Sequence, residues 1–270
     1  MPVKKKQDPN KLSKRLRTKV LRNGILFLVF LILFIFGVVN LFRWGVYTFK
    51  SSSLAKKLVK MGFSQSTILN NENVENEKLK ENPIDFDELK EHNEDTVAWI
   101  TISDTSINYP IVQAENNEYY LHKDFNEKYS TCGWIFMDFR NTPSMVDKNT
   151  VIFGHNIKAG IMFADLQKVH ANELGEKVVI NIYTPTERLD YRVYSSYIRE
   201  PDNYAIKSNI VDNATQYTYI QTMLERSDTI YNVVPDKTDK LITLSTCDST
   251  GNNRILVHGV YVGGETYRKK

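Results

Sequence analysis

The sequence predicts a mainly β domain with a few added helices, preceded by one membrane-spanning helix. Residues 23–42 contain no charged side chain, which is typical of a membrane span. From residue 99 onward, short runs rich in Val, Ile, Thr, Tyr and Phe alternate with Asn, Asp, Gly and Pro, as strands and turns do. Many short strands with few helices between them favour an antiparallel barrel or sandwich over a doubly wound sheet.

Composition and charge exclude several classes of protein. The chain has 270 residues, of which 41% are apolar, so it can bury a good-sized core. Its two cysteines are too few for a disulfide framework or a four-cysteine zinc site, and no metal or other cofactor is expected. Residues 1–50 hold eleven Lys and Arg against one acid, whereas the rest of the chain carries a net charge of −7. This acidic body argues against a nucleic-acid partner, because binding phosphate requires a basic face.

The uncharged segment 23–42 is long enough to cross a membrane. Its length of about 30 Å, at about 1.5 Å per residue, matches the hydrocarbon core of a bilayer. A cleaved signal peptide is the alternative, but the apolar run is long for one and residues 40–44 offer no small-residue cleavage site. Nine Lys and Arg lie in residues 1–22, so the positive-inside rule predicts a cytoplasmic basic tail there. We therefore expect a single-pass protein of the cell membrane with its body outside.

Residues 43–95 are expected to form an extracellular linker with N-terminal helices. Apolar residues between positions 54 and 61 follow a helical spacing, and a second short helix is expected over residues 84–89. Between these helices, residues 70–82 contain almost no apolar side chain, which indicates a loop.

Residues 96–270 are expected to form the domain of short strands. The runs with strand composition are Trp99–Ile102, Asn108–Val112, Thr131–Met137, Asn149–Phe153, Lys177–Ile182, Arg188–Tyr197, Thr229–Val234, Leu241–Ser245 and Arg254–Val262. Residues 158–175 and 212–226 fall in long connections and could form short helices.

Cys247 is the better candidate nucleophile of the two cysteines. It ends an apolar strand, a polar loop over 248–253 follows, and Arg254 opens the next strand. A cysteine at a strand end beside a cation can be held as a reactive thiolate, although a buried structural cysteine is the alternative. Cys132 precedes an apolar run and is expected to be a packing residue. A disulfide between the two cysteines is possible outside the cell but would consume the nucleophile.

A thiol nucleophile needs a base, and His155 is the best placed of the five histidines. It follows the strand 151–153 through one glycine, so it stands on a strand-end turn in front of a rigid strand. His258 lies on the face of Arg254 but about 13 Å further along the strand, and is expected to be structural. The sequence contains no pair of histidines at metal-binding spacing.

The combination of these motifs resembles the sortases, the cysteine transpeptidases of Gram-positive cell surfaces. The family signature T-L-x-T-C followed by Arg appears as Thr243–Cys247 and Arg254. The segments Asn117–Leu121, Ile135–Asp138 and Val151–Asn156 are similar to those of the class B branch. The resemblance covers about residues 85–262.

The resemblance implies a sortase-type eight-stranded β-barrel as the catalytic domain, with N-terminal helices and one transmembrane helix before it. It implies Cys247 as the nucleophile, His155 as the general acid/base, and Arg254 as the group that holds the oxyanion or the substrate. Further residues would border the peptide groove: Ser245, Thr246, Asn117 and Leu121. A carboxylate at Asp248 would raise the pKa of the thiol if it faced the sulfur.

The resemblance also implies a reaction and its partners. Cys247 would attack the Thr carbonyl of a C-terminal sorting signal on a surface protein and form a thioester acyl-enzyme. An amine of a lipid II-like peptidoglycan precursor would then resolve the thioester, which joins the surface protein to the cell wall. Three alternatives stay open: a hydrolytic cysteine peptidase, a pilus-polymerising sortase and a non-catalytic membrane-anchored adhesin. The calcium of class A members is not expected, because no suitably placed acidic cluster occurs.

Overall fold

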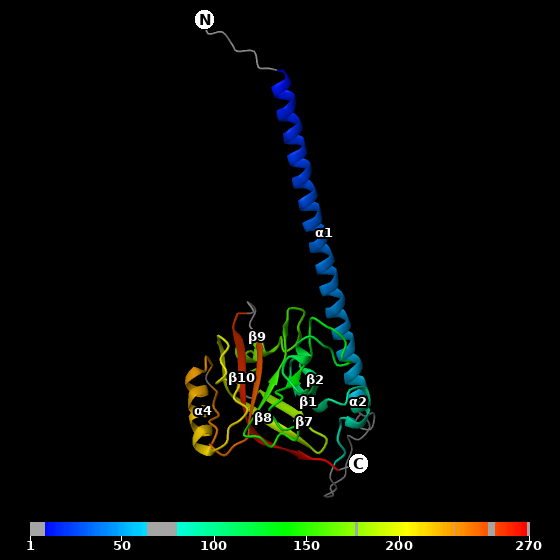
Figure 1. Ribbon diagram of the computed structural model, residues 1–270. Coiled ribbons are helices and arrows are strands. Elements are labelled where there is room, and N and C mark those ends of the chain that lie inside the picture. The colour runs from blue at the N-terminus through cyan, green and yellow to red at the C-terminus, as the bar shows by residue number, and fades with distance from the viewer. Residues whose placement is uncertain (1–8, 64–79, 176–177, 230, 248–251, 269–270) are drawn as a thin grey trace. The chain divides into compact units, whose positions relative to one another are not determined.

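The computed structural model describes residues 9–63, 80–175, 178–229, 231–247 and 252–268 (Figure 1). Contacts divide the chain into two units, Met1–Tyr47 and Thr48–Lys270. The predicted strand start at Lys177, Asp248 and most of the predicted loop 70–82 lie outside the described residues, as does the side chain of Cys247.

The first unit consists of the N-terminal part of the helix α1, which runs over Pro9–Gly62. Its stretch Thr18–Gly62 is long and apolar enough to cross a membrane, and an 18-residue segment within it has a mean hydropathy of 3.1. Large apolar side chains such as Phe27 and Phe34 are each 68% exposed. This helix agrees with the predicted membrane span. Its length and composition also fit a signal sequence.

The second unit contains a closed eight-stranded barrel, as the resemblance predicted. Its strands are β1 Thr96–Ile102, β2 Asn108–Val112, β3 Phe136–Met137, β4 Asn149–Phe153, β7 Val179–Tyr183, β8 Glu187–Arg199, β9 Leu241–Cys247 and β10 Arg254–Thr266. They close in the order β1-β2-β3-β4-β9-β10-β8-β7. The neighbours β2 and β3 are parallel, as are β4 and β9, while the other neighbouring pairs are antiparallel. The hairpin of β5 Asn156–Ile157 and β6 Ile161–Met162 stands outside this ring.

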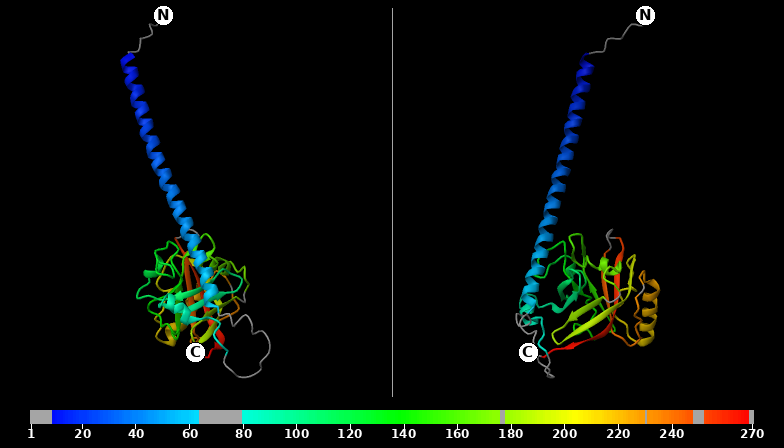
Figure 2. Two further views of the ribbon diagram at one scale, coloured as in Figure 1. Left: turned by 90° about the vertical axis from the view of Figure 1, so that its right-hand side faces the viewer. Right: turned by 180° about the vertical axis from the view of Figure 1, so that it is seen from behind.

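Short helices cover the barrel on its sides. They are α2 Phe86–His92, the 3-10 helix η2 Tyr119–Leu121, α3 Leu166–His170 and α4 Asn213–Arg226. Asp85 and Asp212 cap α2 and α4, because each side chain accepts a hydrogen bond from the backbone N–H three residues on. The helices α2 and α4 lie on opposite sides of the barrel (Figures 1 and 2).

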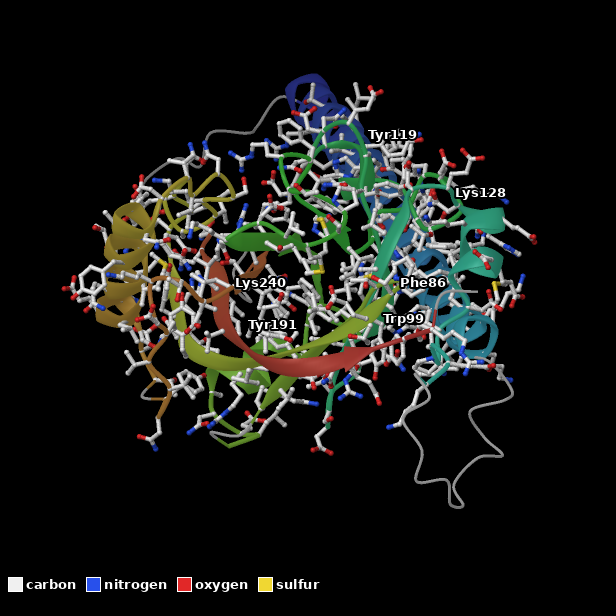
Figure 3. The ribbon with its side chains drawn as sticks, turned by 90° about the horizontal axis from the view of Figure 1, so that it is seen from below. Phe86, Trp99, Tyr119, Lys128, Tyr191 and Lys240 are labelled. Atoms are coloured by element: carbon white, nitrogen blue, oxygen red, sulfur yellow. The ribbon has the colours of Figure 1, made fainter. Side chains whose placement is uncertain are left out.

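The core fills the barrel and continues under the helices. Tyr219, Ile220 and Met223 form one face of α4 and are buried against Tyr194 and Tyr197 of β8. On the other side, Phe86 and Trp99 lie where α2 packs, while Tyr191 lies on the ribbon formed by β8 and β10 (Figure 3).

Of the predicted strands, one is much shorter in the structure and another is not formed in its described residues. The run expected over Thr131–Met137 is a strand only at Phe136–Met137, because Gly133 adopts φ +56° in a turn before it. The run Thr229–Val234 forms no strand in its described residues, since each strand of the closed barrel already has two neighbours. Instead, the hydroxyl of Tyr231 donates to the carbonyl of Val169 at the end of α3, over 3.1 Å.

Other elements differ from the prediction mainly in length. Residues 158–175, a long connection that could form a short helix, contain β6 and the short helix α3, with Asn172 in a left-handed conformation after it. The strand β10 continues to Thr266, beyond the predicted end at Val262, and pairs with β8 along this extension.

Candidate active site

The strand register gathers the predicted catalytic residues at one end of the barrel. In the parallel pair β4 and β9, Phe153 lies opposite Ser245. Cys247 ends β9 two residues after Ser245, and His155 lies two residues after Phe153, just beyond the end of β4. In the antiparallel pair β9 and β10, Cys247 lies opposite Arg254. The three residues therefore lie at or just beyond neighbouring ends of β4, β9 and β10.

A pocket of about 340 Å³ opens at this end of the barrel. Six of the seven predicted site residues line it: His155, Arg254, Ser245, Thr246, Asn117 and Leu121. The seventh is Cys247, whose backbone pairs with Arg254. Residues that are far apart in the sequence thus meet around one cavity.

His155 is held in one tautomer by the backbone. Its Nε2 lies 2.9 Å from the carbonyl oxygen of Leu121. A carbonyl can only accept a hydrogen bond, so Nε2 carries a proton and Nδ1 is the nitrogen that gains or loses one. Burial lowers the pKa of His155, against the opposing effect of this hydrogen bond. The nearby charges of His122 and Arg254 lower that pKa further, so the neutral ring is favoured.

Gly133 makes room for this histidine, and sequence reasoning did not identify it. Its φ is +56°, and a Cβ there would lie 2.7 Å from the carbonyl oxygen of Leu121 and 2.8 Å from Cδ2 of His155. A side chain at this position would push on both partners of the hydrogen bond that orients the imidazole. The only signal in the sequence is a glycine inside an apolar run, which indicates a bend or a close approach.

Arg254 lines the pocket at the start of β10 and is partly buried. One of its guanidinium N–H groups donates to the carbonyl of Asn253 over 3.4 Å. A planar guanidinium facing a pocket can donate to a developing oxyanion or to a peptide carbonyl.

The remaining pocket wall was not predicted. Its apolar part comes from Phe136, Phe153 and Leu256, and the rings of the two phenylalanines lie 5.3 Å apart. The loop after β8 contributes four further residues: Pro201, Asp202, Asn203 and Ile206. Such a loop carries no strand or helix signal, so nothing in the sequence connects it with the distant motifs.

The alternative residues His258 and Cys132 do not line the pocket. His258 is fully buried in the barrel, where its Nδ1 lies 3.0 Å from the hydroxyl of Thr243 and its Nε2 lies 3.3 Å from that of Tyr197. Burial lowers the pKa of His258 to about 3, which keeps the ring neutral. Cys132 is a free, buried thiol, as expected of a packing residue. Among the described residues, no group of three or more His, Cys, Asp or Glu could hold a metal ion.

Known proteins are similar to this chain in sequence and in fold. A family model described as Sortase domain matches residues 100–262. The chain is 35% identical over 179 residues to Sortase B of Listeria monocytogenes, a match that covers 65% of this chain and 73% of that protein. It is similar to a structure of a Staphylococcus aureus sortase B–substrate complex, with a TM-score of 0.69 and 26% identity over 80% of this chain and 98% of that one. A structure of sortase B complexed with triglycine matches with a TM-score of 0.61 and 28% identity over 66% and 85% of the two chains.

Proposed function

Because this chain belongs to the sortase family of cysteine transpeptidases and is most similar to class B members, we propose that it attaches surface proteins to the cell wall. It cleaves a C-terminal sorting signal after Thr and transfers the new acyl group to an amine. The observation that supports this proposal is the register that pairs Cys247 with Arg254, a residue that lines the same pocket as His155.

Each proposed catalytic residue has one chemical task. The neutral imidazole of His155 takes the proton of the Cys247 thiol at Nδ1, and the resulting thiolate attacks the Thr carbonyl carbon. The guanidinium of Arg254 donates to the oxyanion of the tetrahedral intermediate. As the carbon–nitrogen bond breaks, His155 delivers a proton from Nδ1 to the leaving amine, which leaves a thioester. The acceptor amine then attacks the thioester while His155 takes up its proton, and Cys247 departs as the thiolate.

The pocket fits a peptide as the first substrate. Its lining is mostly apolar, with polar groups at Asn117, Ser245 and Thr246, and the backbone of Leu121 beside His155. We propose that these four residues border the bound sorting signal. The substrate complex of the Staphylococcus aureus relative supports a peptide groove in this family.

The acceptor is proposed to be an amine of a lipid II-like peptidoglycan precursor. The complex of a sortase B with triglycine supports an amine nucleophile of this kind. A nucleic-acid partner is not proposed, because the body after residue 50 carries a net charge of −7.

The proposed location is the cell membrane, with the catalytic domain outside. Residues 1–22 form the cytoplasmic basic tail and residues 23–42 the transmembrane anchor. Residues 43–95 form the extracellular linker with N-terminal helices, and residues 96–270 the catalytic domain. Protease treatment of spheroplasts should digest residues 43–270 and spare an N-terminal tag; an exposed tag would contradict this topology.

A trapping experiment tests the proposed reaction. The full chain in detergent micelles is incubated with a pool of octapeptides that each have a central Thr, with and without triglycine. Mass spectrometry should detect an acyl-enzyme at Cys247, and triglycine should increase turnover and give a ligated product. Hydrolysis unaffected by triglycine would instead indicate the peptidase alternative.

Two variants test the nucleophile directly. Cys247→Ala should abolish the acyl-enzyme, whereas Cys132→Ala should retain most of it, because Cys132 is a buried thiol in the core. Loss of the acyl-enzyme in Cys132→Ala alone would reverse the assignment.

A further inference from the structure

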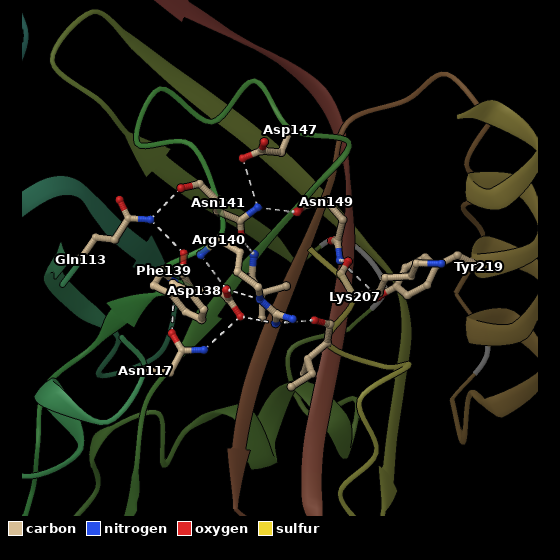
Figure 4. A network of polar contacts seen from close by, with 12 residues as sticks. Gln113, Asn117, Asp138, Phe139, Arg140, Asn141, Asp147, Asn149, Lys207 and Tyr219 are labelled. Atoms are coloured by element: carbon tan, nitrogen blue, oxygen red, sulfur yellow. Dashed lines mark hydrogen bonds and ion pairs between the residues drawn. The ribbon is translucent and has the colours of Figure 1, made fainter. Parts of the chain in front are cut away.

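A buried carboxylate, that of Asp138, contacts the pocket-lining residue Asn117 (Figure 4). Asp138 directly follows β3, and its side chain is fully buried. Its oxygens accept hydrogen bonds from the backbone N–H of Arg140 over 2.9 Å and from Nε and Nη2 of the same residue over 2.8 and 2.6 Å. Burial would raise the pKa of Asp138, but these hydrogen bonds lower it on balance, so the carboxylate is charged.

The same carboxylate fixes the side-chain amide of Asn117, which lines the pocket. The amide nitrogen Nδ2 donates to Asp138 over 3.1 Å, and the amide oxygen accepts from the backbone N–H of Phe139 over 3.0 Å. An ionised carboxylate only accepts and a backbone N–H only donates, so the amide has one possible orientation. The second N–H of Asn117 Nδ2 therefore has a fixed direction in which it can donate a hydrogen bond.

Arg140 extends the connection to a second pocket wall. Besides its fork onto Asp138, its Nη2 donates to the carbonyl of Ile206 over 3.5 Å. Ile206 belongs to the loop after β8, which lines the pocket. From the other side, Arg226 of α4 forms an ion pair of 2.7 Å with Asp202 of the same loop.

The backbone beneath this network is also fixed. The side-chain amide of Gln113, which directly follows β2, donates to the carbonyls of Asp138 and Asn141 over 2.8 and 2.7 Å. Asp138 is thus held by backbone and side-chain contacts at once, which is the arrangement expected of a rigid support for a functional group.

We propose that Asp138 and Arg140 are positioning residues for the peptide substrate: they aim the Asn117 amide at a backbone carbonyl of an extended peptide and hold the Ile206 loop, which lines the same pocket. The proposal rests on the proposed function, because it assigns the peptide to the same pocket. Asp138 and Arg140 act through Asn117 and the loop rather than on the reacting atoms. Their loss should therefore weaken peptide binding more than it slows the chemical step.

The test compares two carboxylates with the same kind of partners. Asp190 accepts from Nε and Nη2 of Arg188 over 2.8 and 3.0 Å and from the amide of Asn181 over 2.7 Å, but it does not line the pocket. Asp138→Asn and Asp190→Asn therefore each disturb an Arg–Asp–Asn trio, and only the first trio borders the proposed groove. The full chain in detergent micelles is assayed with the octapeptide that the unaltered chain cleaves fastest, with triglycine as acceptor.

Asp138→Asn should raise KM about 5- to 10-fold, the equivalent of one hydrogen bond, and change kcat less than about twofold. Asp190→Asn should change neither constant by more than about twofold. A merely structural role of Asp138 would lower the active fraction, and hence the apparent kcat, without changing KM. An unchanged KM in Asp138→Asn would overturn the proposal.

A double variant tests whether Asp138 acts through Asn117. If it does, Asn117→Ala combined with Asp138→Asn should have a KM within about twofold of that of Asn117→Ala alone. If the increase in KM of the double variant equals the product of the two single increases, Asp138 does not act through the amide of Asn117.

A binding measurement separates this proposal from the proposed function. Fluorescence anisotropy of the labelled octapeptides is recorded with Cys247→Ala, alone and combined with Asp138→Asn. If the unaltered chain cleaves no peptide but Asp138→Asn weakens binding about 5- to 10-fold, the proposed reaction fails and the positioning role stands. Equal binding by both variants overturns the positioning role, and absence of both binding and cleavage overturns the two proposals together.

Discussion

Replacing Gly133 with alanine should damage the candidate active site without touching any proposed catalytic residue. The added Cβ would lie 2.7 Å from the carbonyl oxygen of Leu121 and 2.8 Å from His155 Cδ2, whereas ordinary contacts begin near 3.4 Å. Relief of these contacts requires a shift of about 0.7 Å between the residue and its neighbours. Because the carbonyl of Leu121 orients the imidazole, that shift moves the proposed acid/base.

The expected cost can be estimated for activity and for stability. A displacement of about 1 Å at a catalytic group can cost about 100-fold in rate, so Gly133→Ala should lower kcat by about 10- to 100-fold. The left-handed φ costs an alanine about 1–2 kcal/mol, and the crowded contacts add about 1–3 kcal/mol to the loss of unfolding free energy.

Gly160→Ala is the matched control. Gly160 has φ +74°, and a Cβ there meets nothing within 4 Å. It should therefore lose about 1–2 kcal/mol of stability from the backbone alone and keep its activity. Urea unfolding and the peptide-transfer assay measure both quantities for the two variants. If Gly133→Ala keeps a kcat within about threefold of that of Gly160→Ala, the steric reasoning about His155 is refuted.

The remaining predictions concern Arg254 and two histidines. Arg254→Lys keeps the charge but loses the planar fork, so kcat should fall about 100-fold in the transfer assay; a rate near that of the unaltered chain would refute the oxyanion role. Arg254→Gln should raise the pKa of His155, because the charge of Arg254 lowers that pKa. NMR titration of the imidazole measures the pKa in both proteins, and an unchanged value would contradict this prediction. The pKa of His258 is about 3 in the folded chain, whereas the ordinary value for histidine is 6.5. Between these two pH values the unfolded chain therefore binds a proton at His258 that the folded chain does not bind. The free energy of unfolding should therefore fall by about 1.4 kcal/mol per unit as pH drops from about 6.5 toward 3, and urea titrations should show a smaller slope in His258→Gln; equal slopes would contradict the buried neutral imidazole.

Most of the barrel could be predicted because its strands are short, apolar and separated by turn residues. The predicted bounds of β2 and β4 agree with the structure. The errors arise where tertiary context overrides local preference. Residues 131–135 have strand composition but turn at Gly133, and residues 229–234 have it but find no open edge in the closed barrel.

The site could be predicted as far as its motifs extend. His155, Cys247 and Arg254 each stand next to a strand end, which is a local feature that a sequence displays. Their meeting depends on the parallel pairing of β4 with β9, which no local pattern encodes, and it entered the prediction only through the resemblance. The wall formed by residues 201–206 had no such motif and was missed.

The two Arg–Asp–Asn trios show why a side-chain cluster has no function apart from its place in the fold. Asp138 and Asp190 accept hydrogen bonds from the same types of group at similar distances. The amide that Asp190 holds belongs to Asn181, which lies directly opposite it across β7 and β8, so that trio joins two strands of the barrel wall. The amide that Asp138 holds borders a pocket, where a fixed donor direction can select a ligand. The same chemistry therefore serves as a cross-strand link in one place and, as we propose, as a support for substrate recognition in the other.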